Sequence, residues 1–365
     1  MKLRGKEQFK TATGRGLFRE TRAQIMIACI WDDLEPPSFL VDWNEDLRAG
    51  DNDPELYRPA DAINDICFDY GKLENKLKFN KISDEDAMTQ INEIDTRMVQ
   101  WSIDTLANES RWQYFDLQVD DSPHVWNGMV HSYVGFPGPG VWNMYRGVRI
   151  MVTRTQELLA QRFHPSPAAR QAQHSYFRAI RRQLTDEICA TVPVALGHAQ
   201  PAFSSPCVLV TAYNSIWPLF FAGTCVLERI GQGAGTTAAN AGSSAAMAQL
   251  SWILGRFDFI SQEVGLRWAD GVAATLRGDF KIHDDIMPTQ RPREEVAWTP
   301  ELQRRLDDGH KPAWILDIEE SGRGPRILIE GDRDLPRGPG GLRDVDEGGP
   351  KWLGKLLDDD GLRNG

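Results

Sequence analysis

Apolar side chains recur every three or four residues along most of this chain, which is the spacing of one face of an α-helix. The clearest stripe has steps of four, three, four, three and four residues, and it consists of Ala87, Ile91, Ile94, Met98, Trp101 and Thr105. Ser83, followed three residues later by Asp86, supplies a capping start for that helix. Strand signals are scarce, so the pattern predicts an all-α, multi-helix domain of about seven or more packed helices.

Further stripes with the same spacing predict helices over residues 17–28, 63–77, 142–159, 177–188 and 247–268. The first of these stripes consists of Leu17, Thr21, Ile25 and Ala28, and its helix ends before Pro36-Pro37. Pro54 and Pro59 precede the second helix, for which Asp53 is a suitable N-cap. The stripes are too short for coiled coils, because none persists beyond about three heptads.

A few segments break the helical pattern. Residues 112–119 alternate weakly and residues 325–330 form a short apolar run, and these are the strand signals of the chain. Residues 231–246 are small and polar, which predicts a loop between two core helices. Residues 321–365 hold 11 Gly and 4 Pro, a composition typical of disorder. We therefore expect a basic leader over 1–13, a helical domain over 14–285 and a largely disordered Gly/Arg/Asp-rich tail over 286–365.

The charge balance argues against nucleic-acid binding by this chain alone. Its formal net charge is −11, and basic residues cluster only in the first 22 positions. Neutralising phosphates requires clustered Lys and Arg, so we expect no direct, specific DNA binding. The basic start is more simply explained as a solvated leader than as a phosphate-binding arm.

The cysteines indicate neither a disulfide framework nor a metal site. They stand at positions 29, 67, 189, 207 and 225, and no two of them form a C-x-x-C pair. A zinc cluster needs such pairs, and a disulfide scaffold needs an even count at close spacing. We therefore expect reduced, buried thiols in an intracellular protein, and no cofactor in this chain.

One apolar stretch has the length of a membrane-spanning helix. Between Ile188 and Gly255 the only Asp, Glu, Lys or Arg residues are Glu228 and Arg229, and residues 207–227 contain none. Polar and helix-breaking residues interrupt that run, and no basic cluster flanks it. A helix buried on all sides in a large core has the same composition, so we expect core and no membrane contact.

Several motifs occur in a fixed order. They are Trp142, Asn143, Tyr145, Arg146, Arg149 and Ile150; Glu187, Ile188, Cys189, Val192, Pro193 and Gly197; Trp217, Pro218, Leu219, Ala222 and Gly223; and Trp252, Ile253, Arg256, Gly265 and Leu266. Near the start, Gly14, Arg15, Leu17, Phe18, Arg22, Gln24 and Ile25 add a fifth. In this order they resemble the C-terminal helical regulatory region of fungal binuclear zinc cluster transcription factors, over roughly residues 14–280, about three quarters of the chain.

The resemblance implies a regulator of transcription that works in the nucleus and is not an enzyme. Such regions restrain or relay activation, and they bind other proteins of the transcription machinery, a DNA-binding partner or a small-molecule effector. The six-cysteine cluster of the family is not in this chain, so zinc would belong to a separate DNA-binding module. Control of a metabolic or secondary-metabolite gene cluster is a further expectation from the family.

Four residues are the candidates for a structural or effector-linked site. Arg146 and Arg149 lie three residues apart, so they can share one helix face and pair with carboxylates on a neighbouring helix. Glu187 is one candidate partner. A buried bracing pair is the simpler interpretation, and effector binding is the alternative. We expect Trp217 at the centre of the least exposed segment, residues 188–227, which carries no Asp, Glu, Lys or Arg.

An enzymatic alternative is a class I terpene cyclase, in which acidic clusters hold Mg²⁺ against a diphosphate. Asp32-Asp33-x-Glu35 suits the first metal site. The second site would need Asn64-Asp65, but Phe68 and Lys72 occupy the required Ser and Glu positions. The His residues are scattered, and the common hydrolase, phosphate-loop and dinucleotide motifs are absent from the sequence. The sequence therefore assigns no enzyme class.

Overall fold

The computed structural model describes residues 2–31, 34–50, 57–119, 122–135, 138–163, 166–199, 208–232 and 237–278. These residues form ten α-helices, two 3₁₀ segments and one two-stranded hairpin. The predicted all-α class is confirmed. The tail over 286–365, the short run at 325–330, the proposed cap Asp53 and the Asp32-Asp33 pair lie outside the described residues.

The helices have the following bounds: α1 Ala12–Trp31, α2 Phe39–Asp42, α3 Asn44–Ala49, α4 Arg58–Lys78, α5 Asp84–Asn108, α6 Gly138–Phe163, α7 Pro167–Ala195, α8 Val208–Gln232, α9 Thr237–Gln262 and α10 Trp268–Arg277. The 3₁₀ segments are η1 (Lys2–Lys10) and η3 (Ser110–Trp112). The chain forms two compact units, Met1–Ile253 and Leu254–Gly365, so the division falls within α9.

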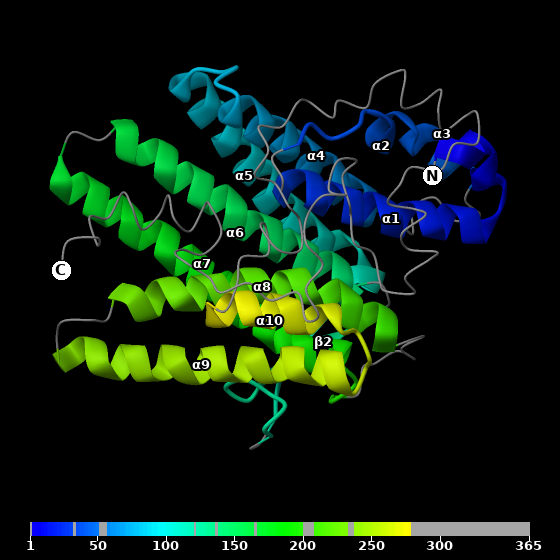
Figure 1. Ribbon diagram of the computed structural model, residues 1–365. Coiled ribbons are helices and arrows are strands. Elements are labelled where there is room, and N and C mark those ends of the chain that lie inside the picture. The colour runs from blue at the N-terminus through cyan, green and yellow to red at the C-terminus, as the bar shows by residue number, and fades with distance from the viewer. Residues whose placement is uncertain are drawn as a thin grey trace, which may run out of the picture. The chain divides into compact units, whose positions relative to one another are not determined.

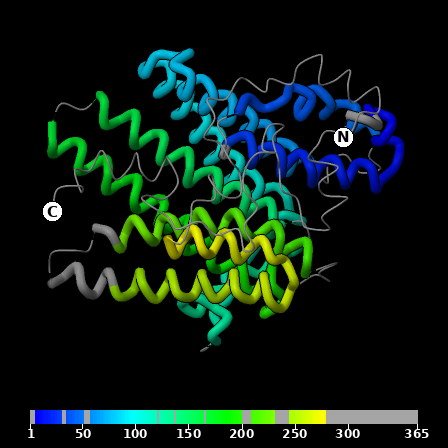
Figure 2. Tube along the Cα trace, viewed as in Figure 1, coloured from blue at the N-terminus to red at the C-terminus, as the bar shows by residue number. Residues whose placement is uncertain are grey.

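In the first unit, α6 is the central helix (Figure 1). It contacts α4, α5, α7 and α8, and the neighbours α4–α5 and α7–α8 also pack on each other. The tube trace shows α6 and α7 running side by side, with α1 beside α4 (Figure 2). A helix contacted on several sides buries most of its surface. Accordingly the six residues of the predicted stripe over 142–159 are all buried; they are Trp142, Tyr145, Val148, Val152, Thr155 and Leu159.

Helix α5 begins as its sequence predicts. Ser83 is the N-cap, and its hydroxyl oxygen accepts a hydrogen bond from the backbone N–H of Asp86 at 3.1 Å. All six residues of the predicted stripe are buried. The cap and the apolar stripe therefore give both the start and the orientation of this helix.

The face predicted for the first helix is wrong. Leu17 is 59% exposed, whereas Phe18, Met26 and Ile30 are buried. The buried face is displaced by one residue because it also contains the charged Arg22, which an apolar stripe does not count. Arg22 donates a hydrogen bond to the carboxylate of Asp61 on α4 at 2.6 Å, and this ion pair fixes the orientation of α1.

The start of the chain is not simply a solvated leader. Phe9, within the predicted leader, is buried, and its ring lies 4.9 Å from that of Phe18 and 5.9 Å from that of Trp43. The guanidinium of Arg15 donates to the backbone carbonyl of Phe9 at 2.6 Å. Basic residues in this segment therefore serve packing as well as solvation, which their charge alone did not indicate.

Two further boundaries differ from the predictions. Pro59 lies inside the first turn of α4 rather than before it, a position where its missing N–H has no helical partner to lose. Most of the loop predicted over residues 231–246 is helical, since α8 continues to Gln232 and α9 begins at Thr237, and residues 233–236 lie outside the described part of the chain. Alanine has the highest helix propensity, and the Ala-rich second half of this segment extends α9.

Helix α8 contains the apolar stretch. Among the described residues, the segment Val208–Ile230 is the one helix long and apolar enough to span a bilayer, and most of it is buried in the structure. Pro218 lies inside this helix. A core helix of a folded domain passes the same test of length and composition, so this segment is weak grounds for a membrane location.

The hairpin consists of β1 (Tyr114–Gln118) and β2 (Met129–Tyr133), which pair antiparallel with Tyr114 opposite Tyr133. Strand β1 coincides with the weak alternation predicted at 112–119. Strand β2 packs on α7 and is mostly buried, whereas β1 is mostly exposed. The hairpin thereby brings the side chains of β2 against the helices that carry the candidate site.

Candidate functional site

The guanidinium of Arg146 lies at the junction of α6, α7 and the hairpin, and its side chain is fully buried. Its Nε donates to the carboxylate of Glu187 on α7 at 3.0 Å. One Nη donates to the hydroxyl oxygens of Tyr133 and Thr191, both at 2.9 Å. The other Nη lies 3.3 Å from Nδ1 of His131. All three guanidinium nitrogens therefore have partners within the protein.

Aromatic rings enclose the same guanidinium. Its central carbon lies 5.1 Å from the ring centroid of Tyr114 and 5.6 Å from that of Trp142. Rings at this range attract a cation through their negative faces. The protein's own side chains thus make the hydrogen bonds and ring contacts that a bound effector would otherwise make to Arg146. The geometry favours the bracing interpretation over effector binding.

The charge state of this cluster follows from its surroundings. Burial disfavours the charged form of Arg146, but its interactions with Tyr133, Glu187 and Tyr114 outweigh that cost and raise its pKa above the ordinary value. Burial, and then the nearby charge of Arg146, lower the pKa of His131 to about 2. His131 is therefore neutral at physiological pH, and the guanidinium is the cation of the cluster.

Arg149 has a different partner. Its Nε donates to the carboxylate of Asp95 on α5 at 2.8 Å, and one Nη donates to the hydroxyl of Tyr145 at 3.1 Å. The two arginines therefore do not act as one pair toward one helix: Arg146 joins α6 to α7, and Arg149 joins α6 to α5. Glu187, the expected partner, contacts Arg146.

Trp217 lies on α8, is buried, and packs its ring against those of Phe220 and Phe221. Phe221 in turn packs against Gly147 of α6. A Cβ added to Gly147 would lie 3.0 Å from the Cδ2 of Phe221 and 3.8 Å from the Cα of Pro218. The Trp-Pro motif on α8 thus packs at a close contact between α6 and α8.

A second buried charge network connects α6, α7 and α8, and the sequence did not predict it. Arg154 donates from Nε and Nη2 to the carboxylate of Glu228, at 2.9 and 2.6 Å. Arg181 donates to the carboxylate of Glu157 at 2.6 Å, and its Nε lies 3.5 Å from Glu228. The signal was present in the sequence, because Glu228 is one of two charged residues in an otherwise uncharged stretch.

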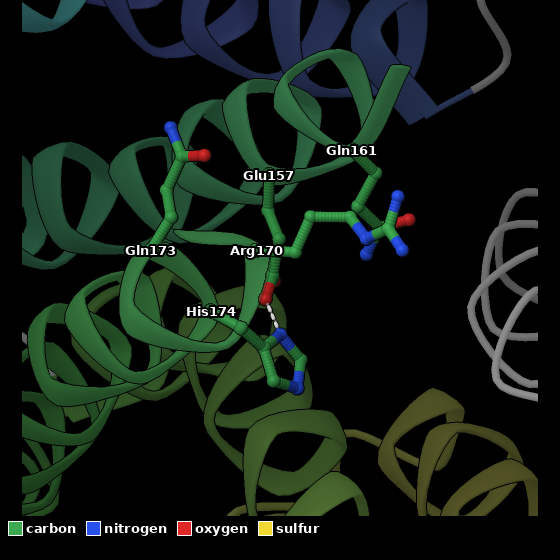
Figure 3. A pocket seen from close by; sticks show the side chains of 5 residues that line it. All are labelled: Glu157, Gln161, Arg170, Gln173 and His174. Carbon is green, nitrogen blue, oxygen red and sulfur yellow. Dashed lines mark hydrogen bonds and ion pairs between the residues drawn. The ribbon is translucent and has the colours of Figure 1, made fainter. Parts of the chain in front are cut away.

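This network ends at a small recess between α6 and α7, lined by Glu157, Gln161, Arg170, Gln173 and His174 (Figure 3). Figure 3 shows the imidazole of His174 pointing at the Glu157 carboxylate, with which it pairs through Nδ1. The recess encloses about 170 Å³ even when open solvent is counted, below the range of ~300–1,000 Å³ typical of ligand pockets. Its one buried carboxylate already has two partners, so the recess is not a convincing effector site.

A third cluster surrounds Asp61, which is fully buried on α4. Arg22 pairs with it at 2.6 Å, Arg19 at 3.5 Å and Arg48 at 3.6 Å. The cluster joins α1, α3 and α4, and a buried carboxylate with several arginines is a strong restraint on their mutual orientation. Its role in the fold is the same as that of the two networks on α6.

Within the described residues, no group of three or more His, Cys, Asp or Glu side chains is arranged to hold a metal ion. Asn64 and Asp65, which a cyclase would need at its second metal site, make hydrogen bonds to other residues of the helical domain. The Asn64 amide donates to the backbone carbonyl of Ala60 at 2.7 Å, and the Asp65 carboxylate accepts from the Asn44 amide at 2.6 Å.

Comparisons of the chain with known protein families, with curated proteins and with solved structures find no match.

Proposed function

We propose that this chain is a regulatory region of the type found in fungal binuclear zinc cluster transcription factors, and that it regulates transcription in the nucleus. One observation supports this proposal above the others. Motifs that are far apart in the sequence, and on which the resemblance depends, meet around α6. Arg146 contacts Glu187 on α7, and Gly147 lies against Pro218 and Phe221 on α8. Motif residues that pack together are expected if the motifs specify one domain rather than occur by chance.

The three buried charge clusters are consistent with a rigid helical scaffold that binds other proteins. Each cluster joins two or three helices, and removing one member would leave buried groups with fewer partners, at a cost in stability. A scaffold of this kind holds its surface in a fixed shape for binding other proteins, and it does not need a reactive group. In this proposal the chain carries no catalytic residue and requires no cofactor.

DNA recognition in this proposal is supplied by a zinc-containing module outside these residues, in the same protein or in a partner. A chain with a formal net charge of −11 lacks the clustered positive charge that phosphate contacts need. In a gel-shift assay, any weak binding through residues 2–22 should disappear between about 50 and 200 mM salt. Sequence-selective binding that survives this salt range would contradict the proposal.

The direct test is to tether the chain to a promoter. Residues 1–365 would be fused to a heterologous DNA-binding domain in a fungal host that carries a reporter gene with matching sites. We expect the fusion to change reporter expression, upward or downward, relative to the DNA-binding domain alone. A fusion with Arg146→Ala, which should strongly destabilise the domain, is expected to lose much of the effect, while Gly16→Ala on the exposed side of α1 should retain it.

The proposal fails if the fusion is nuclear, abundant and folded, yet reporter expression equals that of the DNA-binding domain alone. Folding of the fusion can be checked by a cooperative thermal transition in circular dichroism. The Gly16→Ala control separates an effect of the folded domain from an effect of fusion length.

A further inference from the structure

Strand β1 has one edge that pairs with β2 and one edge that is free. The sheet has two strands within the described part of the chain, and β2 is the principal packing neighbour of β1. Four of the five residues of β1 are exposed, whereas β2 is mostly buried. An edge strand with unpaired main-chain groups is a template for pairing with another polypeptide strand.

The register of the hairpin shows which main-chain groups of β1 face the free edge. The N–H of Val119 donates to the carbonyl of Gly128 at 2.8 Å, and the N–H of Val134 donates to the carbonyl of Gln113 at 3.0 Å. In an antiparallel ladder every second residue makes both of its hydrogen bonds to the partner strand, so the odd-numbered residues of β1 face β2. The main-chain groups that point to the free edge belong to the even-numbered residues, which are Tyr114, Asp116 and Gln118.

These outward groups have no backbone hydrogen-bond partner among the described residues. They recur every second residue over about 14 Å, the length of four residues of extended chain. An extended segment of about five residues can therefore pair with all of them. In such strand addition the main-chain hydrogen bonds give affinity, and the side chains on the two faces select the sequence.

The two faces of β1 differ in chemistry. Phe115 and Leu117 project to one face, because side chains alternate along a strand, and they are 57% and 46% exposed. Asp116 projects to the opposite face, with 65% of its side chain exposed. An added strand would meet apolar side chains on one face and a carboxylate on the other.

Asp116 has no cationic partner within the described residues. Its one ion-pair contact there is to Nε2 of His131 at 3.4 Å, and His131 is neutral at physiological pH. Arg146, beyond His131, is buried and paired with Glu187. Residues 112–145 contain three Asp and no Glu, Lys or Arg. The charge carried by the hairpin therefore favours a basic strand over an acidic one.

We propose that the free edge of β1 binds an extended segment of a partner protein in which basic and apolar residues alternate. The basic residue opposite Asp116 pairs with its carboxylate across the ladder, where Cβ atoms lie about 4.5–5.5 Å apart. The neighbouring apolar residues pack against Phe115 and Leu117. A second copy of this chain fits less well, because it would bring both Asp116 carboxylates to one short edge, where like charges are destabilising. This inference does not depend on the proposed function.

The test measures binding of two peptides to the full chain by fluorescence anisotropy. The first is a fluorescein-labelled nine-residue peptide in which Lys alternates with Val. The second has the same composition and charge, but its lysines come first and its valines follow. We expect the chain to bind the alternating peptide at least about fivefold more tightly than the grouped peptide, because only the first can pair with the edge and fit both faces.

A proline on the free edge tests the main-chain pairing. Gln118→Pro removes one outward N–H and leaves the ladder with β2 intact, because that N–H does not face β2. It should weaken binding of the alternating peptide about three- to tenfold, the effect of one hydrogen bond. The matched control Gln118→Thr keeps the N–H and should bind the peptide nearly as the unaltered chain does.

A second pair of variants tests the charge. Asp116→Asn should weaken binding of the alternating peptide a few-fold, as expected for one exposed ion pair. Asp104→Asn removes the same charge from an exposed position on α5 and should leave the affinity unchanged. Thermal melts of all variants establish that they remain folded.

Three outcomes would overturn the proposal. The unaltered chain could fail to bind the alternating peptide at low salt. The alternating and grouped peptides could bind equally tightly, which would make the binding a property of net charge. Sedimentation velocity could show that the chain forms dimers that Gln118→Pro dissociates, which would make a second copy the occupant of the edge.

Discussion

The guanidinium of Arg146 meets the carboxylate of Glu187 at 3.0 Å, yet the two side chains are not equally buried: the arginine is fully enclosed, and the glutamate keeps 24% of its surface exposed. Water can therefore compensate for the loss of Arg146 at the glutamate. Loss of Arg146 would, however, leave the buried hydroxyl oxygens of Tyr133 and Thr191 without this donor, whereas loss of Glu187 would leave the guanidinium bonded to both of them. The variants Glu187→Ala and Arg146→Ala should therefore differ in their free energy of unfolding.

Glu187→Ala should lower the free energy of unfolding by about 1.5–3 kcal/mol, the range for a hydrogen bond to a charged group. Arg146→Ala should cost more than about 3 kcal/mol, because it also leaves the buried acceptors of the cluster without a donor. Urea denaturation of the two variants, with Glu187→Gln as an isosteric control, measures the difference. Equal costs for both truncations would contradict the asymmetry.

The ion pair between Arg149 and Asp95 should contribute much less. Both side chains are partly exposed, at 17% and 18%, so solvent screens their attraction. A double-mutant cycle with Arg149→Ala and Asp95→Ala should give a coupling energy of about 0.5–1 kcal/mol, and that coupling should fall with added salt. A coupling as large as the whole cost of Arg146→Ala would show that the two arginines brace the fold equally.

His131 should make the stability of the domain depend on pH. Its pKa is about 2 in the folded protein because of burial and then the charge of Arg146, against 6.5 when it is free. Below pH 6.5 the unfolded chain binds a proton that the folded chain does not, so stability falls as the pH falls. The slope from this group is about 1.4 kcal/mol per pH unit, between roughly pH 6 and pH 4.

The measurement is urea denaturation of the chain and of His131→Gln at pH 7 and pH 5. The variant should lose less stability than the unaltered chain over that interval. The carboxylate of Asp116, 3.4 Å from Nε2, acts in the opposite direction, but it is 65% exposed and solvent screens it. If both proteins show the same pH dependence, the imidazole is protonated in the folded state and Asp116 outweighs burial.

The sequence predicted the fold correctly where local features alone determine the structure, as in α5. The stripe and the cap of α5 agree with each other, and both are confirmed. The face of α1 was predicted one residue away from its true position, because its orientation depends on Arg22 reaching Asp61 on another helix. A pattern of apolar residues does not represent a buried charge whose partner is distant in the sequence.

The contacts of the candidate site were likewise predicted only in part. Spacing placed Arg146 and Arg149 on one helix and named Glu187 as a partner, and the first arginine does contact it. The contribution of β2 was not predictable, because Tyr133 and His131 reach Arg146 only through the hairpin. Likewise Arg154, Arg181, Glu157 and Glu228 lie on three helices, and periodicity along one helix does not reveal pairs between helices.

Two glycines in helices should respond to alanine in opposite ways. At Gly147 an added Cβ would lie 3.0 Å from the Phe221 ring, where α6 meets α8. Gly147→Ala should therefore destabilise the domain by about 1–3 kcal/mol, the usual cost of overpacking a core. Gly16 lies on the exposed side of α1, where nothing lies within 4 Å of an added Cβ, so Gly16→Ala should stabilise by about 0.5–1 kcal/mol. Thermal unfolding of both variants tests the close contact, and a gain in stability at Gly147 would show that α6 and α8 are not closely packed.

The buried thiols should be inert until the domain unfolds. Cys29, Cys67, Cys189 and Cys225 are buried and form no disulfide with one another. Burial, followed by the nearby Asp65 carboxylate, raises the pKa of Cys67 to about 12, and burial likewise raises the pKa of Cys189 and Cys225. Reaction with a thiol reagent requires access to the thiolate, and all four side chains are buried. A Cys207→Ser variant, which keeps the four buried thiols, should react with an aromatic disulfide reagent only over hours when folded, and with all four thiols at once in urea. Rapid reaction of any of the four in the folded variant would show that the helix interface around that cysteine opens readily, and mass spectrometry of the labelled peptides would identify which one.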